Sequence, residues 1–251
     1  MNSFAISSIV FVFVAGGGLF GMVLHRILPE NHLSDDSKDV VRLGMGLVAT
    51  MTALVLGLLV SSAKSSFDAL SGEMTRASSK IILLDRTLAL YGPETKDARD
   101  MLRSSVVDTI DRIEMTKSAK LIQMGASTRE VTSFYEKIQG LMPKDERQRS
   151  IQARALGILV SLQESRWLVY EEESTAISVP MLVILLCWLT TLFISFGLFA
   201  PGNATAVAAL LVSALSVSGA ILLILELYSP YGGLIKISSA PLRAALTQLG
   251  N

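Results

Sequence analysis

The chain has 251 residues, of which 51% are hydrophobic and 18% charged, and its mean hydropathy is +0.51. It carries 22 basic and 22 acidic residues, so no excess of one sign points to nucleic acid or to an acidic substrate as a partner. The apolar residues are gathered into long runs, which excludes an ordinary soluble domain. The single cysteine, Cys187, excludes an intrachain disulfide.

Four apolar runs cover residues 4–24, 43–63, 178–199 and 204–225. Each is long enough to cross about 30 Å of hydrocarbon as a helix. We therefore predict an all-α integral membrane protein with four transmembrane helices and a large helical insert between the second and third spans. The expected parts are a first membrane pair (1–64), the insert (65–176), a second membrane pair (177–228) and a tail (229–251).

The start of the chain is expected to be an uncleaved membrane anchor. Residues 1–3 carry no positive charge, and the apolar stretch that follows is too long for a secretory signal. Cleavage after Ala15 is the alternative. With four spans, both termini, the insert and the tail lie on one side of the membrane.

The basic residues near the span ends set the orientation. The side that holds the termini and the insert carries more lysine and arginine than the short loop between the first two spans, so the positive-inside rule places both termini and the insert in the cytoplasm. The expected location is a bacterial cytoplasmic (inner) membrane.

The second span continues into the insert as one predicted helix of about 45–50 residues. From Phe67 to Leu88 the apolar positions are spaced three and four residues apart, and the same spacing extends back into the membrane run. The predicted end is the sequence 91–94, where Gly92 stops the helix and Pro93 suits the first turn of the next one.

The rest of the insert shows helical spacing as well. A second helix is expected over 94–124 with Gly125 as its cap, a short third helix after the capping-box pair Ser127 and Glu130, and a fourth over 145–175 that runs into the third span. The insert is therefore predicted to be a helical bundle with its first and last helices continuous with membrane helices.

The second span is rich in small residues, and four of them recur at intervals of four: Ala49, Ala53, Gly57 and Ser61. Small residues at this interval let helix backbones approach closely, either within one subunit or between subunits. A different set of positions is predicted to face a symmetry axis as an apolar constriction that gates ions by dewetting: Leu47, Met51, Leu54 and Leu58.

Ionisable residues near the membrane are further candidates. Glu226 lies at the end of the fourth span and is either functional or held by a structural partner such as Lys236 or Arg243. The loop after the first span carries four acids that would modestly favour cations at a pore mouth: Glu30, Asp35, Asp36 and Asp39.

The sequence contains no catalytic constellation, phosphate-binding loop or zinc-protease motif, so no enzyme activity, cofactor or metal site is expected. His25 and His32 lack ligand-spaced partners. The glycine run 16–18 with Gly21 lies inside an apolar span and is interpreted as a site of close helix packing.

Several stretches together resemble the bestrophin-like family of bacterial membrane proteins: LPENHL (28–33), VRLGMG (41–46), LDR (84–86), YGPE (91–94), RW (166–167), LEL (225–227) and YGGLIKIS (231–238). The resemblance implies a four-span subunit with cytoplasmic termini. It also implies kinship with bestrophins, pentameric ion channels with the second membrane helix lining the pore. The chain departs from bestrophins because it has neither their aromatic-rich neck nor an acidic calcium-binding cluster.

Two functions from different classes are consistent with these features. The first is a homo-oligomeric ion channel, a pentamer by the resemblance, with its pore lined by the second span. The second is a non-conducting membrane scaffold or sensor whose insert binds a cytoplasmic partner. The partners expected in the first case are the lipid bilayer, inorganic ions and further copies of the chain.

Overall fold

The computed structural model describes residues 3–29, 35–115, 128–174, 179–230 and 232–250. Every regular element in these ranges is a helix, which confirms the predicted all-α class. The chain divides into two compact units. The membrane unit comprises Met1–Ser65 and Ala176–Tyr228, and the insert unit comprises Ser66–Thr175 and Ser229–Asn251.

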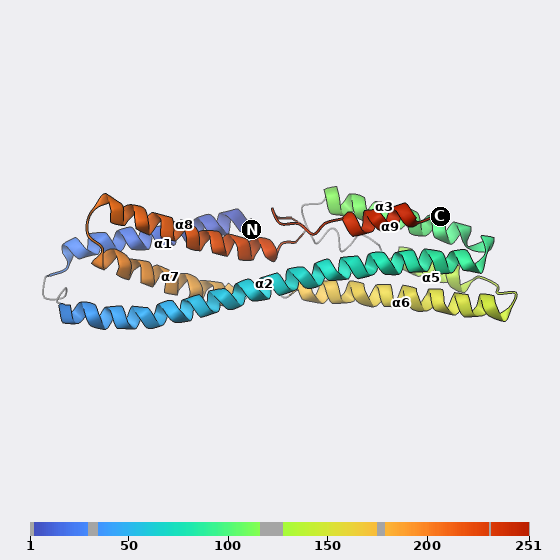
Figure 1. Ribbon diagram of the computed structural model, residues 1–251, viewed down its shortest axis with the longest axis horizontal. Helices are drawn as coiled ribbons and strands as arrows, with labels where there is room; N and C mark the ends of the chain where they lie inside the picture. Colours follow the sequence, from blue (N-terminus) through green and yellow to red (C-terminus); the bar gives the residue numbers. More distant parts are fainter. Residues whose placement is uncertain (1–2, 30–34, 116–127, 175–178, 231, 251) are drawn as a thin grey trace. The chain divides into compact units, whose positions relative to one another are not determined.

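Four helices of the described chain are long and apolar enough to span a membrane, which confirms the four predicted spans. They are α1 (Ser3–Ile27), α2 (Asp35–Tyr91), α7 (Val179–Phe199) and α8 (Ala204–Leu227). In the membrane unit α1 packs against both α7 and α8 (Figure 1). These runs form helices because a backbone in hydrocarbon must satisfy its own hydrogen bonds.

Glycines bring α1 and α7 into backbone contact. A methyl group added at Gly21 would lie 2.1 Å from the Ile194 carbonyl oxygen, and one at Gly197 would lie 1.9 Å from the Gly18 carbonyl oxygen. Only residues without a Cβ atom fit at these two positions. The interpretation of this glycine run as a site of close helix packing is therefore confirmed for Gly17, Gly18 and Gly21, whereas Gly16 is exposed.

A buried hydrogen bond joins α1 to α8. The Ser7 hydroxyl donates to the Ser218 carbonyl oxygen at 2.8 Å, and the Ser218 hydroxyl donates to the Ala214 carbonyl oxygen one turn earlier at 2.8 Å. Because both hydroxyls have acceptors, neither leaves an unpaired polar group inside the membrane unit. The start of α8 is capped by the Asn203 side chain, which accepts from the Ala206 amide at 2.8 Å.

The helix α2 is continuous over 57 residues, from Asp35 to Tyr91. The prediction of one unbroken helix through span and insert is confirmed, and the helix begins eight residues earlier than the apolar run. It ends where expected: Gly92 has φ +137°, a conformation that side-chain-bearing residues rarely adopt, and Pro93 opens the short helix η2 (Pro93–Thr95).

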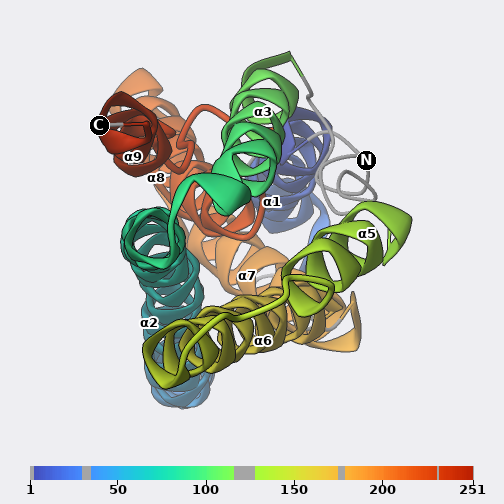
Figure 2. The same ribbon diagram turned by 90° about the vertical axis from the view of Figure 1, so that its right-hand side faces the viewer.

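The insert unit packs the second half of α2 with four further helices: α3 (Lys96–Met115), α5 (Thr128–Gln139), α6 (Glu146–Ser174) and α9 (Ala240–Gln248). Figure 2 shows α6 alongside α2. The predicted stripes of α2, α3 and α6 meet in one core, which contains Leu84, Leu88, Leu102, Val106 and Ala155. The predicted caps Gly125 and Ser127 and the join between α6 and α7 lie outside the described residues.

The end of the chain belongs to this bundle. Leu242 and Leu249 of the α9 region join the core, and Ala245 is fully buried. Arg243 forms an ion pair with Glu114 of α3, and the Ser239 hydroxyl donates to the same carboxylate at 2.9 Å. The sequence analysis treated residues 229–251 only as a tail and did not identify this helix.

The turn at the distal end of α2 is held by polar contacts. The Gln148 amide donates to the Tyr91 carbonyl oxygen at 3.0 Å, and Lys144 and Glu94 form an ion pair at 2.6 Å. The Tyr91 side chain is 4% exposed, and its hydroxyl has no hydrogen-bond partner among the described residues. Burial raises the pKa of Tyr91, and the Glu94 charge adds to that shift.

Candidate functional site

In the membrane unit α2 packs on one narrow face. Thr52, Leu59 and Ala63 are buried, and their spacing of seven and four residues places them on one side of the helix. The Thr52 hydroxyl donates to the Val48 carbonyl oxygen at 2.6 Å, so it is satisfied inside its own helix. The other sides of the span are open in the single chain.

The four predicted pore residues lie away from that packed face. Leu47, Met51, Leu54 and Leu58 are all exposed, and they form one stripe that is roughly 130° around the helix from Thr52 at about 100° per residue. Leu54, for example, is 66% exposed. The structure therefore brings these four side chains onto one open surface of α2.

The four-residue repeat of small residues also remains largely uncovered. Ala49 is half-buried, whereas Ala53, Gly57 and Ser61 are exposed. A methyl group added at Gly57 would meet no atom within 4 Å, and the same holds for Gly44 and Gly46. Within the described part of one chain no helix packs closely on this surface, so its role in helix packing stays a prediction.

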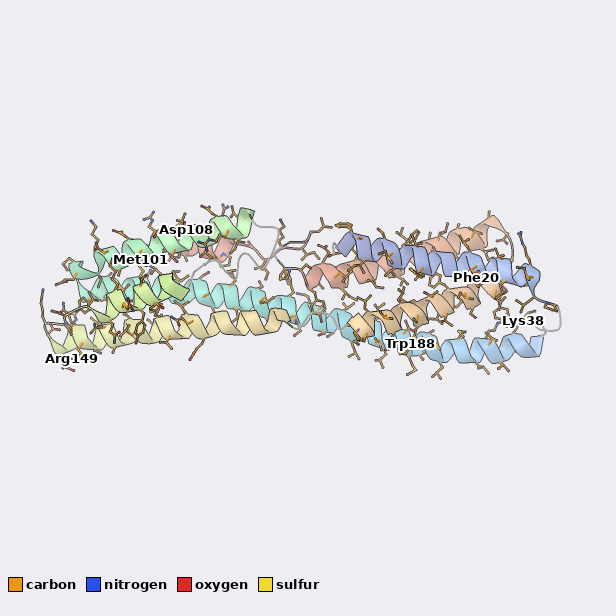
Figure 3. The ribbon with its side chains drawn as sticks, turned by 180° about the vertical axis from the view of Figure 1, so that it is seen from behind. Phe20, Lys38, Met101, Asp108, Arg149 and Trp188 are labelled. Atoms are coloured by element: carbon orange, nitrogen blue, oxygen red, sulfur yellow. The ribbon has the colours of Figure 1, made fainter. Side chains whose placement is uncertain are left out.

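The second span differs from the others in how little of it is covered. Only 11% of its apolar window is buried within the chain, compared with 39% for α1. Exposed apolar residues occur on α1 as well, where Phe20 projects outward (Figure 3). Lipid covers such residues without difficulty. Among the described spans α2 is distinguished by the number of its open glycines, because Gly44, Gly46 and Gly57 have no atom within 4 Å of an added methyl group, whereas α1 and α8 each have one such glycine.

The candidate acid lies at the end of the fourth span. Glu226 is buried in the last turn of α8 and interacts with other groups of the protein. Two residues further on, the Tyr228 hydroxyl donates to the Ser62 hydroxyl oxygen of α2 at 3.2 Å. Arg243, one of the partners considered for Glu226, is paired with Glu114 instead. A functional role for Glu226 stays a prediction.

The acids predicted in the loop after the first span lie mostly on a helix. Asp35, Asp36 and Asp39 belong to the first turns of α2, where carboxylates are favoured by the positive end of the helix. Asp39 pairs with Arg42 at 3.5 Å, which reduces the field it would contribute to a pore mouth. Glu30 and His32 lie outside the described residues, and so do the side chains of Asp35 and Asp36.

Metal ligation has no support in the residues that the structure describes, because they contain no group of three or more histidine, cysteine or acidic side chains in ligand geometry. His25 is exposed in the last turn of α1.

A buried ion pair in the insert was missed by the sequence analysis. Asp85, whose side chain is 2% exposed, accepts two hydrogen bonds from the Arg99 guanidinium, at 2.7 Å from Nε and 2.9 Å from Nη2. This hydrogen bonding raises the pKa of Arg99. The signal in the sequence was an aspartate beside the apolar seam of α2, at a position where a charge needs a partner.

The fold and the surfaces described above define an all-helical membrane protein with four spans and a helical insert. A comparison with protein families matches residues 11–242 to the Bestrophin-like domain, so the chain belongs to this family and the resemblance seen in the sequence is confirmed. Membership points, in general terms, to an ion-channel-like membrane function. Comparisons with curated proteins and with solved structures give no match.

Proposed function

We propose that this protein is a homo-oligomeric ion channel with its pore lined by the open face of α2. The observation that carries the proposal is the exposure of that face in a single chain: its large apolar side chains are exposed, and its glycines have no atom of the described residues within 4 Å of an added methyl group. Copies of α2 around a central axis would cover the small residues and enclose the leucines.

The glycines favour a protein neighbour over lipid. A helix that faces only lipid gains nothing from Gly46 and Gly57 on the small-residue side, each of which lowers helix propensity by roughly 1 kcal/mol relative to alanine in a helix interior. Their benefit comes when another backbone approaches closely. We therefore assign the small-residue side of α2 to contact with a neighbouring copy of the same helix.

The leucine stripe then forms the constriction. A ring of Leu47, Met51, Leu54 and Leu58 offers ions no polar group, so water leaves the narrow section readily and ions cannot pass until it widens. Beyond this stripe the exposed position Ser65, seven residues after Leu58, is polar, which is suited to a hydrated continuation of the path. In this proposal the protein lies in a bacterial inner membrane with both termini in the cytoplasm.

Ion flux through liposomes containing the purified protein tests the proposal. Leu54→Ala and Leu58→Ala are expected to raise leak at least several-fold, because a smaller side chain widens and wets the constriction. The matched control is Leu215→Ala on α8, which removes an equally exposed leucine from another span and should leave flux unchanged.

Two outcomes would contradict the proposal. One is wild-type protein that passes no ions at any tested pH, calcium concentration or voltage. The other is an equal effect of Leu54→Ala and Leu215→Ala. An intact oligomer without flux, together with a stoichiometric soluble partner bound by the insert, would instead support the scaffold or sensor function.

A further inference from the structure

The insert unit contains an open cleft of about 520 Å³ between the end of α2 and the end of α9. Its lining residues are Arg86, Ala89 and Leu90 of α2 with Gln248 of α9. This volume is within the range of small-molecule sites, about 300–1,000 Å³. The cleft is separate from the membrane face of α2 that carries the proposed pore, so it calls for its own explanation.

The charge of the cleft is set by Arg86. Its side chain is exposed, and it makes no hydrogen bond or ion pair with any residue that the structure describes. The neighbouring acid in the sequence, Asp85, is turned into the core toward Arg99. Among the described residues no acid lines the cleft, and the Gln248 amide can both donate and accept hydrogen bonds. The polar part of the described lining therefore consists of this amide and the positive charge of Arg86.

The rest of the lining is apolar. Leu90 is one of the more exposed large hydrophobic residues of the insert unit, and Ala89 adjoins it. An apolar wall beside a guanidinium lowers the local dielectric constant and strengthens its attraction for an anion. It also gives an apolar group a surface that it can cover. Such a lining favours a ligand that has both an anionic group and an apolar group.

The two walls of the cleft are fixed before any ligand arrives. One is the continuous helix α2, and the other is held by Leu249, which is buried in the core. The Gly250 amide donates to Asp85 Oδ2 at 3.4 Å, and the Arg103 guanidinium donates to the Leu249 carbonyl oxygen at 3.5 Å. The positive charge of Arg103 therefore lies at the negative end of α9, where a cation is favoured.

We propose that this cleft binds an organic anion, with a carboxylate or phosphate head held by the Arg86 guanidinium and a compact apolar body lying over Leu90 and Ala89. A guanidinium matches such heads with two parallel hydrogen bonds, which a lysine ammonium cannot reproduce. The binding site does not require that the protein conducts ions, so this proposal can be tested independently of the proposed pore.

Calorimetric titration of the full chain in lipid nanodiscs with phenyl phosphate tests the site. Saturable binding is expected, and Arg86→Gln should weaken it at least tenfold, because a hydrogen-bonded charge pair is lost. The affinity of Arg86→Lys for phenyl phosphate should lie between those of the wild type and of Arg86→Gln. Leu90→Ser should weaken phenyl phosphate several-fold but leave the weaker binding of inorganic phosphate unchanged.

The matched control is Arg76→Gln, which removes another exposed arginine of α2 that already pairs with Glu73 and lies outside the cleft. It should bind phenyl phosphate like the wild type. Circular dichroism checks that the exposed substitutions keep the fold. The proposal is overturned by wild-type protein without saturable binding, by equal affinities of wild type and Arg86→Gln, or by inorganic phosphate that binds as tightly as phenyl phosphate.

Binding and flux together separate this site from the channel. Binding through Arg86 in protein that passes no ions would keep the site and contradict the pore. Flux with the expected effect of Leu54→Ala, but without Arg86-dependent binding, would keep the pore and remove the site.

Discussion

Two glycine-bearing surfaces of the membrane unit have opposite surroundings. Between α1 and α7, Gly21 and Gly197 sit against the backbone of the other helix with no room for a methyl group. On α2, Gly44, Gly46 and Gly57 meet nothing within 4 Å. The first surface shows what close packing of small residues achieves inside one chain. The second has the same composition without a partner, which is the reason for assigning it to a neighbouring copy.

The largest loss of stability is expected from a substitution at a glycine that is covered by another helix. Gly197→Ala places a methyl group 1.9 Å from the Gly18 carbonyl oxygen, so α1 and α7 must separate, at a cost of at least about 3 kcal/mol. The control Gly16→Ala adds a methyl group in open space. Thermal unfolding in detergent should show a much lower midpoint for the first variant. Equal midpoints would mean that the two helices are not in backbone contact.

A substitution on the uncovered surface of α2 should change the assembly of the chains and leave the fold of each chain intact. Gly57→Leu is expected to leave the single chain folded but to dissociate the oligomer, because a bulky side chain keeps α2 backbones apart. Gly219→Leu on α8, where a methyl group also meets nothing within 4 Å, is the matched control. Native mass spectrometry measures the copy number. The same copy number for both variants would argue against a neighbour at Gly57.

A third comparison is between a buried and an exposed acidic residue of the insert unit. Asp85→Ala leaves the Arg99 guanidinium without its buried partner and should destabilise the protein by about 3 kcal/mol. Asp108→Ala removes an exposed acid from the outer side of α3 (Figure 3) and should change the stability little. Thermal midpoints at one scan rate compare the two. A small effect of Asp85→Ala would show that Arg99 reaches water easily.

A smaller effect of opposite sign is expected at Tyr91. Its hydroxyl is buried without a partner among the described residues, so Tyr91→Phe removes a desolvated polar group and should stabilise the protein by about 1 kcal/mol. The thermal midpoint should rise. A lower midpoint would mean that the hydroxyl has a hydrogen-bond partner, such as a group on another copy of the chain.

The smallest effect concerns the attachment of α9. Hydrogen bonds from Arg243 and then Ser239 lower the pKa of Glu114 below its ordinary value of 4.5. A carboxyl with a lowered pKa stabilises the folded state above its unfolded pKa, and this stabilisation is lost as the pH falls through the folded pKa. The midpoint difference between wild type and Glu114→Gln should therefore shrink below about pH 4.5. A constant difference would contradict the ion pair.

Much of the fold could be predicted because its signals are local. The length of α2 follows from an apolar seam without a helix breaker, and its end follows from Gly92 and Pro93. The helix α9 was missed because its apolar contacts, Leu242 and Leu249, lie in a short segment that gains stability only from the core it joins. Its pairing with α3 is a tertiary effect that spacing does not encode.

The candidate site was predictable only in part, for a related reason. Helical spacing correctly places Leu47, Met51, Leu54 and Leu58 on one stripe. It does not say which stripe the other helices cover, because coverage depends on where they pack. The same limit explains why one set of small residues proved to be buried between α1 and α7 while the set on α2 proved to be open.

The central claim, that the leucine stripe of α2 lines an ion pore and does not face lipid, is tested most directly by cysteine labelling. Cys187 is the sole cysteine, so Cys187→Ser gives a background in which Leu54→Cys or Leu215→Cys is the only thiol. We expect a membrane-impermeant methanethiosulfonate reagent to modify Leu54→Cys and block ion flux, and to leave Leu215→Cys unmodified. Leu54→Cys that stays unmodified, with unchanged flux, would place that face against lipid and contradict the account.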